Sequence, residues 1–269
     1  MTATPSLPPF RRVRWANVAT YYAIACAISW PLFWWRWSAP TSFASWQPPV
    51  PKNVLYMSGP GLAALICFVR FRTTHVRTVT LWGTSAARSL AAWLLPAVLL
   101  AGVYGSELHR DEGWGRLVGL MTLGFVATLG EELGWRGFLQ DALRPLPRGR
   151  RYFLIGVLWE AWHFTTRWGD GGALGVVVRV AFAALVLIVL SWLIGELVDR
   201  TRSVVVAVTM HAWFNLALEA SSALPGSPVR AWGALGASCL AWWWIVRTWP
   251  PAPPQGPGDG DPASTPLHG

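Results

Sequence analysis

Three short polar clusters interrupt the long apolar stretches of this sequence, and each carries groups that can hold or move protons. Glu131 and Glu132 stand together in the first cluster, His163 lies in the second, and His211 and Asn215 form the third. A carboxylate and an imidazole together suit a general base that activates water for hydrolysis. Imidazole and amide N–H groups can also donate hydrogen bonds to the oxyanion of a tetrahedral intermediate. The residue types therefore indicate hydrolysis by an activated water.

The spacing within the clusters fits side chains that project from helices. Glu132 and Arg136 are four residues apart, so they would share a helix face and could form an ion pair. His211 and Asn215 are also four apart and would point the same way. Glu131 would lie about 100° around the helix from Glu132. One helix would then offer a paired carboxylate and an unpaired one.

The same residue types leave a metal-dependent alternative open. Two histidines and one glutamate with a free fourth position form a known hydrolytic zinc site. In this sequence the three ligands would be Glu131, His163 and His211. Spacing alone does not choose between the metal and the metal-free reaction.

The composition is that of a membrane protein. Of the 269 residues, 53% are hydrophobic, 13% are charged and 20 are Trp, with a net charge of +9. Soluble domains have about 25% charged residues, roughly twice as many. A basic nucleic-acid-binding protein would not contain so much apolar sequence, so no nucleic acid is expected as a partner. The three cysteines lie far apart in apolar stretches, which argues against a disulfide framework.

The hydropathy pattern predicts an all-α fold, a polytopic transmembrane helix bundle of about eight spans. A cytoplasmic segment (1–14) would precede the bundle (15–248), and a disordered tail rich in Pro and Gly (249–269) would follow it. The expected spans are 15–35, 54–71, 89–105, 117–135, 152–168, 173–196, 203–220 and 230–248.

The distribution of basic residues predicts the orientation of these spans. With a cytoplasmic N-terminus, 15 of the 22 basic residues fall in inner segments and six in outer segments. This bias follows the positive-inside rule and places both termini in the cytoplasm. The sequence thus predicts a multi-pass protein of the lipid bilayer.

Ionisable side chains inside a bilayer are costly and are functional by default. His163 would lie roughly 16 Å, and His211 roughly 12 Å, from the inner ends of their spans, so the clusters share the cytoplasmic half of the membrane. A structural alternative is that these residues only hydrogen-bond between helices. The competing hypothesis is a non-catalytic scaffold, or a proton-coupled transporter that uses the same Glu/His cluster.

The three clusters resemble the motifs of the CPBP intramembrane proteases, which include the type II CAAX prenyl endopeptidases and the bacterial Abi proteins. The EExxxR motif matches residues 131–136, and the HxxxN motif matches His211 and Asn215. The FxxxH motif reads Trp159-x-x-x-His163, an aromatic exchange that also occurs among bacterial members. Order and spacing agree over about residues 115–220.

The resemblance implies an intramembrane endopeptidase and assigns a role to each motif. Glu131 and His163 would position and activate the water as catalytic residues. His211 and Asn215, also catalytic, would form the oxyanion hole.

The remaining motif residues would support the site. Glu132 and Arg136 would brace it, and the ring of Trp159 would pack beside an imidazole. We expect no tightly bound cofactor, with zinc as the alternative. The substrate would be a membrane-embedded or lipidated peptide or protein, cleaved in a bacterial plasma membrane.

Two further local patterns carry structural expectations. Glu196 and Asp199 are expected to pair with Arg200 or Arg202, which follow them closely in the sequence. Gly130 and Gly134 form a small-xxx-small pair, which predicts a close approach between helices.

Overall fold

The computed structural model describes residues 12–38, 52–95, 113–167 and 172–223, with residues 233, 236, 239–240, 242–245 and 247–250. Within this part of the chain the architecture is helical, as expected, and its single β-bridge joins Thr80 to Ser203. The expected spans 89–105 and 230–248 lie partly outside the described residues. The same holds for most of the expected terminal segments, 1–14 and 249–269.

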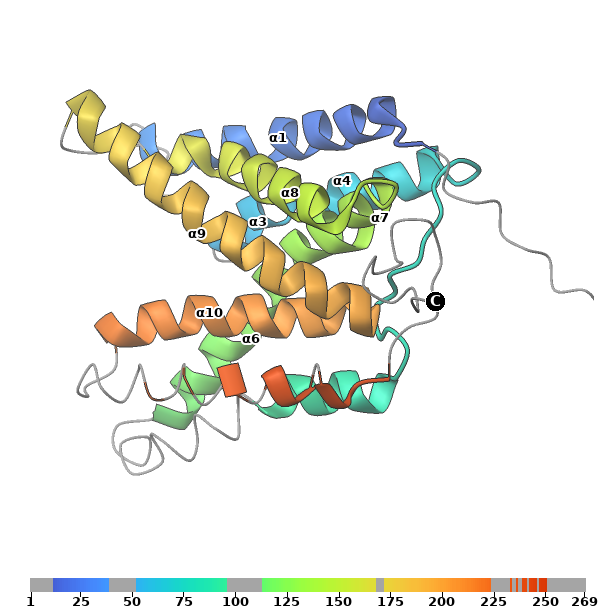
Figure 1. Ribbon diagram of the computed structural model, residues 1–269. Coiled ribbons are helices and arrows are strands. Elements are labelled where there is room, and N and C mark those ends of the chain that lie inside the picture. The colour runs from blue at the N-terminus through green and yellow to red at the C-terminus, as the bar shows by residue number, and fades with distance from the viewer. Residues whose placement is uncertain are drawn as a thin grey trace, which may run out of the picture.

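The helices follow one another in a bundle whose members cross at several angles (Figure 1). Helix α1 packs on α4, α8 packs on α9, and α10 packs on both α6 and α9. In Figure 1, α9 runs diagonally past α8 toward the start of α10. The named elements are α1 (Trp15–Ser38), α3 (Lys52–Met57), α4 (Gly59–Arg70), α6 (Gly113–Glu132), a π-helical segment (Leu133–Leu139), α7 (Gln140–Ala142), α8 (Arg148–His163), a 3-10 turn (Phe164–Thr166), α9 (Gly172–Thr201) and α10 (Val204–Ala223).

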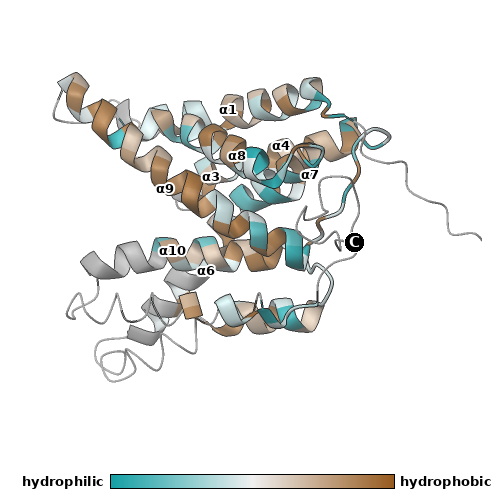
Figure 2. Cartoon of the chain, viewed as in Figure 1, coloured by the Kyte–Doolittle hydropathy of each residue, from teal (hydrophilic) through white to brown (hydrophobic). Residues whose placement is uncertain are grey.

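Helix α9 is 30 residues long and is, among the described residues, the one helix both long and apolar enough to cross a membrane. Val54–Arg70, Ala86–Leu95 and Val204–Asn215 are shorter apolar helices. Leu174, Val177 and Phe182 on α9 are exposed, and apolar residues run along the outside of the bundle (Figure 2). An outward-facing apolar helix is the form that suits lipid rather than water.

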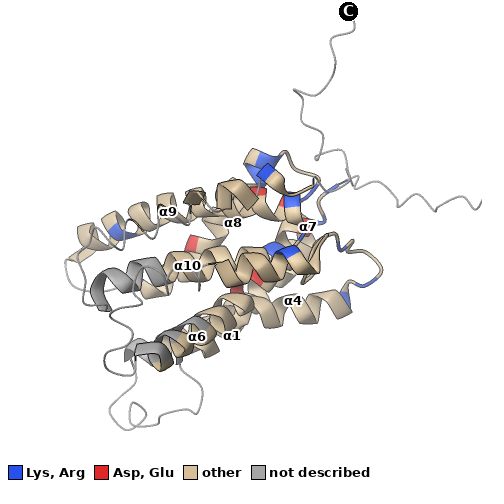
Figure 3. Cartoon of the chain, turned by 90° about the horizontal axis from the view of Figure 1, so that it is seen from below, with Lys and Arg blue, Asp and Glu red and all other residues tan. Residues whose placement is uncertain are grey.

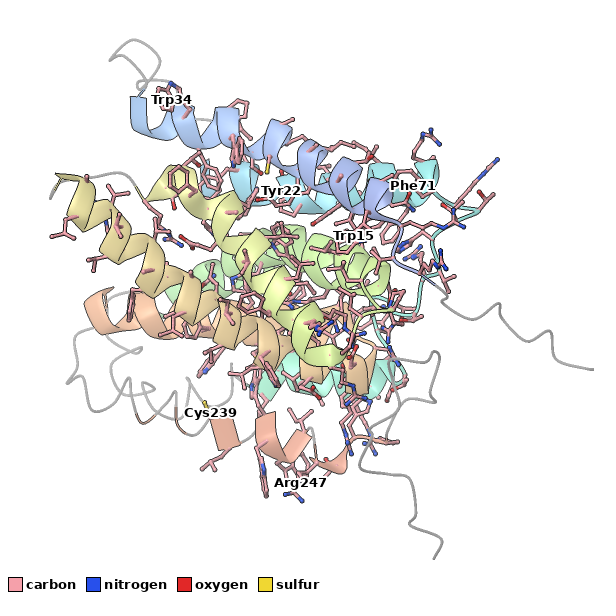
Figure 4. The ribbon with its side chains drawn as sticks, turned by 45° about the horizontal axis from the view of Figure 1, so that its top comes forward. Trp15, Tyr22, Trp34, Phe71, Cys239 and Arg247 are labelled. Atoms are coloured by element: carbon pink, nitrogen blue, oxygen red, sulfur yellow. The ribbon has the colours of Figure 1, made fainter. Side chains whose placement is uncertain are left out.

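Two exposed tryptophans mark the ends of α1. Trp15 and Trp34 lie at opposite ends of this helix (Figure 4), and both side chains are exposed. Their separation along the helix axis is about 28 Å at 1.5 Å per residue, which is close to the roughly 30 Å of a hydrocarbon core. Tryptophan is enriched at both membrane–water interfaces. The described length of α1 therefore suits a membrane span.

Glycine allows backbone contact between α4 and α6. A Cβ built on Gly130 would lie 2.7 Å from the carbonyl oxygen of Met57, and one on Gly61 would lie 2.6 Å from the carbonyl oxygen of Gly130. A Cβ on Gly134 would meet the Pro60 carbonyl oxygen at 2.6 Å. The expected small-residue packing of Gly130 and Gly134 is confirmed. It fixes the backbone on either side of Glu131.

We expect Gly130→Ala to destabilise the protein by about 1–3 kcal/mol, because the added methyl group must displace backbone atoms. The measurement is the unfolding midpoint in detergent micelles. Gly124→Ala is the matched control on α6, since among the described residues a Cβ there meets no atom within 4 Å beyond the backbone of its own helix. The control should be neutral or slightly stabilising, and equal midpoints for the two variants would contradict the tight crossing.

A buried ionic network joins α7, α8 and α9 at one end of the bundle. The carboxylate of Asp199 accepts hydrogen bonds from Tyr152 Oη at 2.6 Å, from Gln140 Nε2 at 2.9 Å and from Arg151 Nη2. Arg202 lies 3.9 Å from the same carboxylate. The expected pairing of Asp199 with Arg202 is thus confirmed at long range, while its shortest contacts come from other elements. Glu196 pairs with Arg148 at 3.8 Å instead of with Arg200 or Arg202.

The same network holds the loop that follows α4. Asp141 accepts hydrogen bonds from the backbone N–H groups of Thr78 and Val79 at 2.6 and 3.1 Å, and pairs with Arg144 at 2.8 Å. Figure 3 shows that Lys and Arg positions, coloured blue, gather at this end of the bundle, around α7. The loop is therefore anchored to α7, which is separated from Glu131 and Glu132 by the π-helical segment alone.

Candidate active site

Glu131 lies one residue before the end of α6, and its side chain is fully buried. Its Oε2 accepts a hydrogen bond of 2.7 Å from the indole Nε1 of Trp159. Its Oε1 has no hydrogen-bond partner among the described residues, and the Trp135 indole approaches the carboxylate without completing a hydrogen bond. A buried carboxylate oxygen without a partner is costly. It is therefore poised to bind a water molecule.

Glu132 has both of its oxygens occupied, in contrast to its neighbour. Its Oε2 accepts from Arg136 Nε at 3.0 Å and its Oε1 accepts from His211 Nδ1 at 2.9 Å. Arg136 in turn donates to the hydroxyl and the carbonyl oxygen of Ser191 on α9, at 3.1 and 3.3 Å. The expected pair of Glu132 and Arg136 is confirmed, and it links α6, α9 and α10.

The segment between Glu132 and Gln140 is π-helical. Leu133–Leu139 follow α6 directly, and the N–H of Gln140 bonds to the carbonyl oxygen of Trp135, five residues back. Such widened turns are rare and are frequently found at functional sites. Trp135, Arg136 and Phe138 are all fully buried in it.

The hydrogen bonds of the two histidines assign their tautomers. His163 Nδ1 lies 3.1 Å from the carbonyl oxygen of Trp159, and His211 Nδ1 lies 2.9 Å from the Glu132 carboxylate. Both partners can only accept, so each Nδ1 carries the proton. When a ring is neutral, its lone pair therefore lies on Nε2, which can then accept a proton or a hydrogen bond.

The ring of Trp159 is the point where the three sequence clusters meet. It packs edge-on against the His211 ring at 4.9 Å between centroids, and lies 6.3 Å from the His163 ring. His211 is close enough to interact electrostatically with both Glu131 and His163. The structure thus brings together the side chains of Glu131 from α6, Trp159 and His163 from α8, and His211 from α10.

Asn215 is placed less decisively than the other expected site residues. It lies one turn after His211 on α10 and is half-buried. It makes no hydrogen bond to another residue in the described ranges. Its expected role at an oxyanion stays a prediction.

The indole N–H of Trp159 and the contacts of Ser191 were not expected from the sequence. The aromatic exchange at Trp159 indicated packing beside an imidazole, which the structure contains, but not a donor to Glu131. The only indication in the sequence was that residue 159 is Trp rather than Phe, because Trp is the one apolar aromatic residue whose ring carries an N–H. Nothing in the sequence indicated the contact of Ser191 with Arg136, because the two residues are 55 positions apart.

A metal site is not assembled by these side chains alone. Within the described residues, no three His, Cys, Asp or Glu side chains are grouped so that they could hold a metal ion. The atoms of Glu131, His163 and His211 that could still coordinate a metal are Oε1 and the two Nε2 atoms, because Glu131 Oε2 and both Nδ1 atoms already have hydrogen-bond partners.

The comparison with known families covers the segment that builds the site. Residues 113–217 match a family model described as "Type II CAAX prenyl endopeptidase Rce1-like". This match supports membership of the chain in the CPBP family. The matched segment begins with α6, ends within α10 and contains all of the motif residues from Glu131 to Asn215. No curated protein matches the chain.

CPBP membership agrees with the helical fold and with the apolar helix α9. The Rce1-like members are integral membrane proteases, so a membrane-associated peptide is the class of substrate for this family. Glu160, a buried acidic residue beside the site, pairs with Arg167 at 2.7 Å and takes no part in the cluster. Glu131 and Glu132 are therefore the two carboxylates that contact Trp159 and His211 among the described residues.

Proposed function

We propose that this protein is an intramembrane endopeptidase that hydrolyses a peptide bond of a membrane-embedded or lipidated protein by a water that Glu131 activates. The observation that carries the proposal is the asymmetry of Glu131. One of its oxygens is held by Trp159, and the other is buried and without a partner. A general base needs this combination of fixed position and a free acceptor atom.

In the proposed reaction, Glu131 Oε1 takes a proton from the water as its oxygen attacks the scissile carbonyl carbon. His163 Nε2 accepts the second hydrogen bond of the water and orients it. The carbonyl oxygen becomes an oxyanion, which accepts hydrogen bonds from Asn215 and from His211 when both ring nitrogens carry protons. Glu131 then passes its proton to the leaving amine as the C–N bond breaks, which restores the free carboxylate.

Glu132 and Arg136 take no proton in this scheme. Glu132 orients the His211 ring through Nδ1, as carboxylates commonly do for functional histidines. Arg136 balances the Glu132 charge and joins it to Ser191 on α9. They brace the groups that face the substrate.

The proposed topology is a bundle of eight spans with both termini in the cytoplasm, in a bacterial plasma membrane. The gathering of Lys and Arg at the α7 end of the bundle supports a cytoplasmic location for that end (Figure 3). Glu131 and Glu132 precede α7 by only one π-helical segment. The site would then lie in the cytoplasmic half of the bilayer.

Comparative peptidomics tests the proposed function. Membranes from cells that express the natural chain are compared with membranes from cells that express Glu131→Gln. We expect new peptide termini only with the natural chain. Proton-coupled uptake that Glu131→Gln abolishes, with no cleaved peptide in either membrane, would instead support a transporter.

Metal dependence has a separate expected result. We expect phenanthroline to leave the cleavage rate within about twofold of the untreated rate, because the proposed proton transfers use side chains alone. The rate is measured on purified protein in detergent micelles or vesicles. Loss of activity that added zinc restores would overturn the metal-free mechanism.

A further inference from the structure

Trp159 makes the one hydrogen bond that Glu131 has within the described residues. The donor is the indole Nε1 and the acceptor is Oε2, 2.7 Å away, and both side chains are fully buried. Hydrogen bonds to an ionised carboxylate are among the stronger ones in proteins, and the low dielectric constant of a buried site strengthens such a bond further. The contact therefore helps to fix the position of the Glu131 carboxylate.

The indole ring is held rigidly by its neighbours. The His211 ring meets it edge-on, the Arg136 guanidinium lies 5.4 Å from its centroid, and Trp135 lies 6.5 Å away. A ring packed on these sides cannot turn its N–H away from Glu131 without moving the other site residues. The backbone of Trp159 also orients His163, through its carbonyl oxygen.

We propose that Trp159 is a positioning residue of this site, whose indole N–H occupies Glu131 Oε2 so that Oε1 alone accepts the proton of the water. This inference rests on the proposed hydrolytic function. A phenylalanine at this position would keep the packing against His211 and the carbonyl contact to His163. It would leave both oxygens of Glu131 without a donor from this ring.

Trp159→Phe tests the inference, and Trp162→Phe is its matched control. Trp162 is on the same helix, is fully buried, and packs against Trp135 at 5.9 Å and His163 at 4.5 Å. Its Nε1 has no hydrogen-bond partner among the described residues. The two substitutions remove the same atoms, and only the first removes a bonded donor.

The kinetic measurement is kcat and KM for cleavage of a membrane peptide that the natural chain cleaves. We expect Trp159→Phe to lower kcat about 10- to 100-fold, as the loss of one hydrogen bond to a charged group predicts, with KM unchanged within about twofold. Trp162→Phe should keep kcat within about threefold. Equal kcat values for the two variants, at equal unfolding midpoints, would overturn the inference.

A spectroscopic measurement separates this inference from the proposed function. The infrared band of the Glu131 carboxyl group is identified by its loss in Glu131→Gln. We expect the band to shift in Trp159→Phe and to stay in place in Trp162→Phe. If the natural chain cleaves no peptide and the band still shifts in Trp159→Phe, the proposed function is contradicted and the hydrogen bond is supported. If the band does not shift in Trp159→Phe, the positioning role of Trp159 is contradicted directly.

Discussion

Glu131→Gln is expected to lower the rate of peptide cleavage by at least about 10³-fold, the largest effect of any single change at the site. The amide has nearly the same shape as the carboxylate and can still accept from Trp159. It cannot take a proton from water at neutral pH. The measurement is single-turnover cleavage by purified protein, with the amount of folded protein checked by its unfolding transition.

Glu160→Gln is the control for this result. It makes the same exchange at another buried acidic residue, one that pairs with Arg167 rather than facing the cluster. Its cleavage rate per folded molecule should stay within a few-fold of the natural rate. Full activity in Glu131→Gln would refute the mechanism, whatever the result for the control.

Asp199→Ala is expected to reduce the free energy of unfolding by about 3–5 kcal/mol, because it leaves buried cationic partners without their counter-charge. Arg151, Tyr152 and Gln140 all donate to this carboxylate. The three donors lie on α7 and α8, so the loss should loosen the end of the bundle that holds the loop after α4. Unfolding in detergent, followed by tryptophan fluorescence, measures the change.

Glu196→Ala provides the comparison one turn earlier on α9. Glu196 is 41% exposed and lies 3.8 Å from Arg148, which is 37% exposed. An exposed ion pair of this kind contributes at most about 1 kcal/mol. If both variants were destabilised by the same small amount, the network around Asp199 would not be the structural element that the buried contacts indicate.

Contacts between residues close in sequence could be predicted well. The spacing of Glu132 and Arg136 predicted their ion pair, and the structure contains it at 3.0 Å. The same reasoning placed Gly130 and Gly134 at a close helix crossing. In each case helical periodicity alone fixes which side chains share a face, so no knowledge of the rest of the fold was needed.

Contacts between distant elements could not be predicted in the same way. Asp199 was expected to pair with its sequence neighbours, yet Arg200 donates to the Trp249 carbonyl oxygen and the shortest contacts of Asp199 come from α7 and α8. Hydropathy shows that a helix is apolar, but it does not show which helix lies beside it. The order of the motifs predicted that Glu131, His163 and His211 belong to one site. It could not predict the hydrogen bond from Trp159 to Glu131, because that contact depends on how α6 and α8 are rotated about their axes.

The π-helical segment Leu133–Leu139 makes this part of the chain sensitive to its length. Each residue added to or removed from a helix turns everything beyond it by about 100°. Glu131 and Glu132 lie before the segment, and Gln140 and Asp141, which hold Asp199 and the loop after α4, lie after it. Removing one residue here and restoring ordinary α-helical winding would, by contrast, keep the two flanking sets in nearly the same relative orientation, because the wide turns already accommodate one extra residue. The residues inside the segment, Arg136 among them, would change direction, so such a deletion would disturb the site while leaving the packing beyond it in place.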